Sequence, residues 1–169
     1  ISLIQFSSLL RNTLNQADSE FIMIKDEIRF LKEYIDLEKM RLEDKFSYQF
    51  FIDDKTNQDQ MIPTFIIQPF VENAIHHGLK GKVEPGKLTL DFILEEPLLK
   101  VIIEDDGLGY NKTSRAKRKN RISHGIQTIK NRLEIYNGRY SEEAIKIEDL
   151  SDSKSGRSGT RIVVDIKIK

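Results

Sequence analysis

The chain has 169 residues, enough for one domain with a substantial hydrophobic core. Its 27 basic residues balance its 27 acidic residues, so net charge gives no reason to expect a nucleic-acid or membrane-surface partner. The absence of cysteine excludes disulfides and thiolate metal sites, and no apolar run reaches the roughly 20 residues that span a bilayer.

The first quarter of the chain predicts two amphipathic helices. Between residues 2 and 15, apolar residues recur at three- and four-residue steps, and residues 16–20 form a polar break. A second helix is expected from about Lys25 to Lys45, with one apolar face formed by Ile24, Ile28, Leu31, Ile35 and Leu42. Two such helices joined by a short link suggest a helical hairpin at residues 1–45, followed by a second unit at residues 46–169.

The pattern changes period after residue 45. Strict alternation over residues 46–52 predicts a half-buried strand, and residues 53–60 read as a polar loop. The next helix can begin at Pro63, but a second proline at position 69 would kink it. We therefore favour a regular helix that begins at Gln68–Pro69 and ends at Gly78.

The second half of the chain predicts a sheet. Alternation over residues 88–94 and 99–103 indicates two strands joined by a short turn, an antiparallel hairpin that ends at Asp105. A basic loop is expected at 111–122, a helix from Gly125 to Tyr136, a short strand at 145–147, turns at 151–159 and a last strand at 162–168. Together these elements predict an α+β fold: a two-layer α/β sandwich with a mixed, mostly antiparallel sheet, helices on one face, and a helical hairpin before it.

Two polar motifs interrupt these apolar elements. Glu72 and Asn73 are adjacent in an otherwise apolar helix, where unpartnered polar side chains are costly. Asn73 offers an amide oxygen suited to Mg²⁺, and Glu72 can hold a water or act as a base. Asp105 ends an apolar strand, where its carboxylate can accept a hydrogen bond from an adenine amine. The alternatives are a solvent-facing helix pair and an ordinary acidic turn.

Further residues fit the same nucleotide site. Gly107 and Gly109 allow positive φ and a close approach of the backbone to a ligand. The basic loop, with Lys112 and Arg115, precedes a helix N-terminus near Gly125 and would form a lid over phosphates, although charge runs are more often solvated surface. Smaller contributions are expected from His77, which would orient the Glu-Asn pair, and from Thr160, whose hydroxyl could approach the base. A zinc site at His76 and His77 lacks further ligands.

In this order the motifs resemble the catalytic part of a sensor histidine kinase of the LytS-like group, within the GHKL ATPase superfamily. The resemblance covers nearly the whole chain. It rests on the segments 9–11, 33–41, 62–63, 68–69, 72–78, 105–109, 125–133 and 159–160.

The resemblance implies a Bergerat-type ATP-binding fold at 46–169 and a dimerisation hairpin at 1–45. It implies Mg²⁺ bound at Asn73, adenine read by Asp105, and a lid between residues 109 and 125. It also implies nucleotide contacts from the residues at His76, His77, Gly107, Gly109, Lys112, Arg115, Gly125, Ile126 and Thr160. Glu72 would assist transfer of the γ-phosphoryl group to a histidine. The implied partners are ATP, a response regulator and a second copy of the intact protein; the implied setting is the cytoplasmic domain of a membrane-anchored sensor.

Three features depart from the family pattern. The family usually has lysine where His76 stands, and a neutral imidazole would hold phosphate less firmly. The glycine-rich segment reads Ser123-His124-Gly125-Ile126, with one glycine missing. The phosphoacceptor histidine of the family lies upstream of the first helix, and none of the three histidines matches it. The alternatives are therefore a nucleotide-binding or regulatory module without turnover, and an autonomous ATPase or serine kinase.

Overall fold

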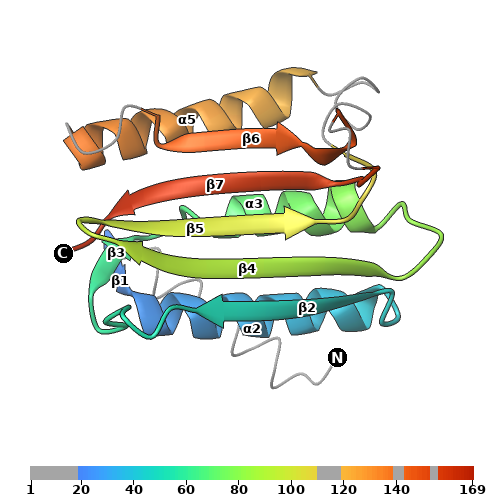
Figure 1. Ribbon diagram of the computed structural model, residues 1–169, viewed down its shortest axis with the longest axis horizontal. Helices are drawn as coiled ribbons and strands as arrows, with labels where there is room; N and C mark the ends of the chain where they lie inside the picture. The colour runs from blue at the N-terminus through green and yellow to red at the C-terminus, as the bar shows by residue number, and fades with distance from the viewer. Residues whose placement is uncertain (1–18, 110–118, 139–142, 153–155) are drawn as a thin grey trace.

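A five-stranded sheet organises the molecule, and the computed structural model describes it over residues 19–109, 119–138, 143–152 and 156–169. The strand order is β2-β4-β5-β7-β6 (Figure 1). Only β2 and β4 pair in parallel, and the other neighbours are antiparallel. The strands are β2 (Phe46–Ile52), β4 (Gly86–Glu95), β5 (Leu98–Asp105), β6 (Ile145–Asp149) and β7 (Thr160–Lys167).

The helices lie behind this sheet in Figure 1 and cover one of its faces. They are α2 (Ile24–Arg41), α3 (Gln68–Asn73), the π-helical segment η1 (Ala74–Leu79) and α5 (Lys119–Asn137). Buried and more exposed residues alternate along β5 and β7, as expected for strands with one packed face. The predicted two-layer α+β fold is confirmed. Within the described ranges, no helix is both long enough and apolar enough to cross a bilayer.

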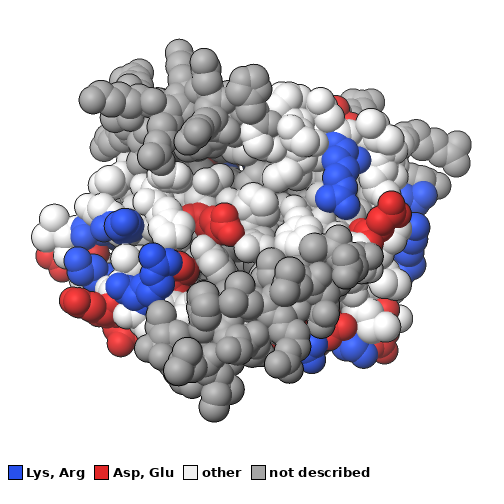
Figure 2. All heavy atoms as spheres, turned by 180° about the vertical axis from the view of Figure 1, so that it is seen from behind, with Lys and Arg blue, Asp and Glu red and all other residues white. Residues whose placement is uncertain are grey.

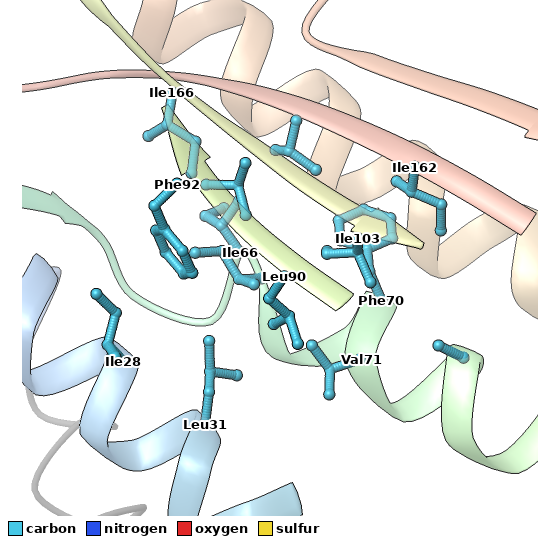
Figure 3. Packing of buried hydrophobic residues seen from close by; sticks show 14 of the residues in the cluster. Ile28, Leu31, Ile66, Phe70, Val71, Leu90, Phe92, Ile103, Ile162 and Ile166 are labelled. Atoms are coloured by element: carbon cyan, nitrogen blue, oxygen red, sulfur yellow. The ribbon is translucent and has the colours of Figure 1, made fainter. Parts of the chain in front are cut away.

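One hydrophobic core joins the helices to the sheet. Figure 3 shows Ile28 and Leu31 of α2 on the same side of β4 as Phe70 and Val71 of α3. Burying a side chain of this size stabilises the fold by about 1.5–3 kcal/mol. The apolar face of α2 belongs to the same core as the sheet, and the division into residues 1–45 and 46–169 stays a prediction. The hairpin itself stays a prediction, because residues 2–15 lie outside the described residues.

Several element boundaries differ from the prediction. Two short strands, β1 (Phe21–Met23) and β3 (Met61–Pro63), pair antiparallel and were not predicted, because three residues are too few to show a period. Pro63 therefore ends a strand, and the helix begins at Gln68, as favoured from the sequence. The α2 helix ends at Arg41 rather than near residue 45, and the next residues include two with positive φ, at Glu43 (53°) and Asp44 (57°).

The α5 helix begins six residues before its predicted start at Gly125. A single glycine costs a helix only about 1 kcal/mol, too little to end it, and the residues before Gly125 include good helix formers. The end of the helix is as predicted, at Asn137 followed by Gly138 in the left-handed region with φ 57°. The apolar face of α5 includes Leu133, which is fully buried against the core.

Candidate functional site

Two segments meet at Gly78. One is the helix that carries the Glu-Asn pair, and the other is the Asp-x-Gly-x-Gly turn. A Cβ added to Gly78 would lie 2.5 Å from Oδ1 of Asp105, and a Cβ added to Gly107 would lie 2.3 Å from the Gly78 carbonyl oxygen. The backbone N–H of Leu108 donates to that same oxygen at 3.3 Å. Because both contacts require glycine, the two motifs form one continuous surface of backbone and carboxylate.

The carboxylate of Asp105 is buried at this junction. The residue is only 3% exposed, and its Oδ1 accepts a hydrogen bond from the Gly107 N–H at 2.9 Å. Burial raises the pKa of Asp105 to about 6, although the backbone hydrogen bonds from Gly107 and Thr160 oppose this rise. The carboxyl group therefore changes ionisation close to neutral pH, and in its ionised form it is an acceptor with few competing waters.

The first residues of β7 close the other side of Asp105. Thr160 is the register partner of Asp105 and is buried, and the predicted approach of its hydroxyl to a base stays a prediction. A Cβ added to Gly159 would lie 1.8 Å from the Asp105 carbonyl oxygen, and Gly159 has φ 121°. Gly109 also needs to be glycine, since it has φ 86° and a Cβ would lie 2.8 Å from Oδ1 of Asp149. The turn thus requires glycine at both positions 107 and 109.

The residues that precede Gly78 are arranged along the same helix. Asn73 is half-buried and ends α3, and the helix then widens into the π-helical segment η1. Such widened turns are frequent at functional sites. Five residues of helix separate Asn73 from Gly78, a rise of about 7 Å along the axis. Asn73 therefore precedes, on the same helix, the glycine that contacts Asp105.

The side chains of Glu72 and His76, which lie near Asn73 in the sequence, each have a partner within the protein. Glu72 is half-buried and accepts a hydrogen bond from Gln68 Nε2 at 2.9 Å. The Nε2 atom of His76 lies 3.3 Å from Oε2 of Glu38, on α2. Burial and the nearby carboxylates of Glu72 and Glu38 raise the pKa of the Tyr34 phenol. The Glu-Asn helix therefore packs against α2 through a cluster of polar groups.

Sequence reasoning missed Glu38, although a signal was present. The apolar series on α2 continues at the same spacing through position 38, where the residue is glutamate. Its side chain is buried, whereas the charged residues of an amphipathic helix normally face water. A glutamate within the apolar series of a helix is therefore a sign of a buried partner, here His76.

The remaining predicted residues are not all brought to this junction. Lys112 and Arg115, with most of the predicted lid, lie outside the described residues. Gly125 lies inside α5, so the predicted helix N-terminus near Gly125 is wrong, whereas a nucleotide contact from Gly125 stays a prediction. Gly125 is exposed, and Ile126 packs half-buried against the core.

No group of three or more His, Cys, Asp or Glu side chains that could hold a metal ion occurs in the described part of the chain. A divalent cation at Asn73 would accordingly need oxygen ligands from a bound nucleotide and from water.

The helix-bearing side of the molecule is seen in Figure 2. Basic and acidic side chains of the described residues lie beside one another on this face.

Comparisons with known proteins find similarity to histidine kinases. Residues 2–46 match the family model described as "Histidine kinase". The chain is 35% identical, over 107 residues, to the sensor protein LytS of Staphylococcus epidermidis; the match covers 63% of this chain and 18% of that protein. The chain thus spans a small part of the length of the curated relative.

Solved structures show the same fold at low sequence identity. The histidine kinase domain of the blue-light activated histidine kinase from Erythrobacter litoralis EL346 aligns with a TM-score of 0.60 at 15% identity, covering 99% of this chain and 75% of that chain. The histidine kinase ThkA, solved in complex with the response regulator protein TrrA, aligns with a TM-score of 0.55 at 12% identity, covering 98% of this chain and 48% of that chain.

Proposed function

We propose that this chain, which belongs to the LytS-like sensor histidine kinases, is the ATP-binding catalytic region of a two-component sensor. It binds Mg·ATP and presents the γ-phosphoryl group to a histidine that lies upstream of this chain. The transfer breaks the bond between the γ-phosphorus and its bridging oxygen, forms a P–N bond on the acceptor imidazole and leaves ADP, while the imidazole proton passes to a base. The phosphoryl group then passes to a response regulator aspartate.

The observation that carries this proposal is the glycine-lined contact between Gly78 and Asp105. A buried carboxylate is costly unless it has partners, and within the described residues the Asp105 carboxylate has backbone hydrogen bonds from Gly107 and Thr160 but no cationic side chain paired with it. The exocyclic amine of adenine is a donor that fits such an acceptor. Because Gly78 and Gly107 have no side chains, the turn and the Asp105 carboxylate pack directly against the backbone of the Glu-Asn helix, which fixes the carboxylate beside that helix.

The metal and the phosphates would lie toward Asn73. A magnesium ion prefers oxygen ligands and is usually held by one or two protein groups together with substrate phosphates and water. The Asn73 amide oxygen fits that role, with His76 and His77 on the following turn. When bound, Mg²⁺ would neutralise charge that builds up on the phosphate oxygens.

Glu72 is the candidate for proton transfer. It lies next to Asn73, is half-buried, and has its Oε1 fixed by the amide of Gln68 at 2.9 Å. A carboxylate held in this way can accept a proton from an attacking imidazole or hold a water against it. The reaction is otherwise a matter of positioning and charge neutralisation.

The partners follow from the proposed reaction. A response regulator would receive the phosphoryl group, and the structural likeness to a kinase solved with a response regulator supports that partner. We also propose that the intact protein is a homodimer, with the described region as its cytoplasmic catalytic part.

Calorimetric titration with ATP, with and without Mg²⁺, tests the proposal. We expect binding in the micromolar to low millimolar range that depends on Mg²⁺, and a large loss in the isosteric variant Asp105→Asn. No binding at millimolar ATP would favour a regulatory module that has lost nucleotide affinity. Incubation of this chain alone with radiolabelled ATP should give no acid-labile, base-stable phosphoryl group, because the acceptor histidine lies elsewhere.

A further inference from the structure

We propose that Glu38 is a positioning residue of the nucleotide site, and that it orients the His76 ring toward the phosphates. The inference rests on the proposed function, since it assigns a role within the same site. It also makes α2 a supporting part of the site in addition to a part of the core.

The contact geometry supports a directed pair. The Glu38 side chain is only 4% exposed, and its Oε1 accepts a hydrogen bond from Arg41 at 2.6 Å. Its Oε2 lies 3.3 Å from His76 Nε2 but has no hydrogen-bond donor with good geometry among the described residues. The His76 side chain is 35% exposed, so the ring reaches from the buried carboxylate to the surface of the helix.

Other polar and charged side chains lie close to this pair. A buried carboxylate oxygen without a hydrogen-bond partner is unfavourable, so a ring N–H turned toward Oε2 of Glu38 would be stabilised there. Glu72, on α3, is a second carboxylate near Tyr34, while Arg41 pairs with the other oxygen of Glu38, Oε1. Tyr34 lies close enough to both carboxylates for them to raise its pKa.

The pair also fixes which nitrogen faces the ligand. An imidazole has two distinct ring nitrogens, and a partner at one of them sets the orientation of the other. With Nε2 facing Glu38, Nδ1 is the ring nitrogen of His76 left to face a phosphate oxygen. His76 follows Asn73 by three residues and therefore lies on the neighbouring part of the same helix surface.

A double-mutant cycle on nucleotide affinity tests the proposal. The variants are Glu38→Gln, His76→Gln and the double variant, titrated with Mg·ATP by calorimetry. We expect each single variant to weaken binding by about tenfold, and the double variant to bind no more than about twofold weaker than His76→Gln, because coupled residues are non-additive. Losses that multiply to about a hundredfold in the double variant would overturn the proposal.

Glu27→Gln is the matched control. Glu27 is a buried glutamate on the same helix, 1% exposed, with an Oε2 atom that has no hydrogen-bond donor among the described residues. It lies about 16 Å before Glu38 along the helix axis. The same chemical change there should leave Mg·ATP affinity within about twofold of the original chain. An equal loss in the two Glu→Gln variants would show that α2 acts only through general packing.

A measurement without nucleotide separates this inference from the proposed function. The ¹⁵N shifts of the His76 ring, assigned with His76→Gln, report the protonation and hydrogen bonding of each nitrogen. We expect these shifts to change in Glu38→Gln and not in Glu27→Gln. Unchanged ring shifts in Glu38→Gln would overturn the inference even if ATP binds, whereas failure of the original chain to bind ATP would contradict only the proposed function.

Discussion

Replacing Gly78 with alanine perturbs the contact on which the nucleotide site depends. The new Cβ would lie 2.5 Å from Oδ1 and 2.8 Å from Cγ of Asp105, where ordinary contacts are 3.4–4 Å. The backbone around the carboxylate is already closed by Gly107 and Gly159, whose own added Cβ atoms would meet backbone. The Asp105 side chain must therefore rotate away from Gly78.

The cost to stability should be small. Rotation breaks the hydrogen bond from the Gly107 N–H to Asp105, and a hydrogen bond to a charged group contributes about 1.5–3 kcal/mol. Alanine in place of glycine returns about 1 kcal/mol through helix propensity. The net destabilisation is about 0.5–2 kcal/mol, or a fall in Tm of about 1–8 °C for a chain of this size.

The effect on ligand binding should be much larger. Calorimetric titration of Gly78→Ala with Mg·ATP at neutral pH should show a loss of at least about tenfold, since every 1.4 kcal/mol is tenfold in affinity. Gly81→Ala is the control, because its Cβ would meet only the flexible end of the Leu108 side chain at 3.0 Å. We expect that control to bind ATP within about twofold of the original chain.

Unchanged ATP affinity in a folded Gly78→Ala variant would refute the reasoning, because it would show that the position of the Asp105 carboxylate does not matter for the ligand. If the variant fails to fold, Asp105→Asn answers the same question, since it keeps the size of the side chain and removes the charge. Full affinity in that variant would equally contradict the role of Asp105.

Three further predictions concern pH and stability. The affinity for Mg·ATP should fall as pH drops below about 6, because the raised pKa of Asp105 leaves its carboxyl group protonated there. Titrations of ATP binding from pH 8 to 5 that show no such fall would mean that the ionised carboxylate is not used. Burial raises the pKa of Glu27 to about 7, so the folded state holds a proton that the unfolded state releases, and stability contributed by this group is lost as pH rises through 7. Glu27→Gln should therefore raise the Tm at pH 8 and have little effect at pH 5, and an equal change at both pH values would contradict this linkage. Asn137 is 1% exposed, donates to the Asp165 carbonyl at 2.7 Å and accepts from the Lys167 N–H at 2.8 Å. Asn137→Ala should therefore lower the free energy of unfolding, measured by denaturant titration, by about 2–3 kcal/mol. A loss below about 0.5 kcal/mol would count against this prediction.

Periodicity predicted the elements that carry the site. Alternation identified β2, β4, β5 and β7, because each has one face on the core and one toward solvent. The same reading placed Asp105 at the end of β5 and the Glu-Asn pair within α3, as the structure has them. The order of those motifs was also enough to identify the kinase resemblance, which the comparisons bear out.

Sequence patterns failed to predict features that depend on more than the neighbouring residues in the chain. The start of α5 was misplaced because a glycine was read as a boundary, although its cost is small beside a run of helix formers. The π-helical widening after Asn73 has no distinct residue pattern. The burial of Glu38 depends on a partner from another helix, so its place in the apolar series could be noticed but not interpreted.

The sequence by itself determined which residue types this protein has available for a nucleotide: an amide on a helix, a carboxylate at a strand end and glycines in the following turn. Only the tertiary structure decided that Gly78 lies against Asp105 and that Glu38 lies against His76. Both contacts join residues far apart in the chain. They are fixed by strand register and by the packing of α2 and α3 on one sheet, which depend on the whole core and not on any local pattern.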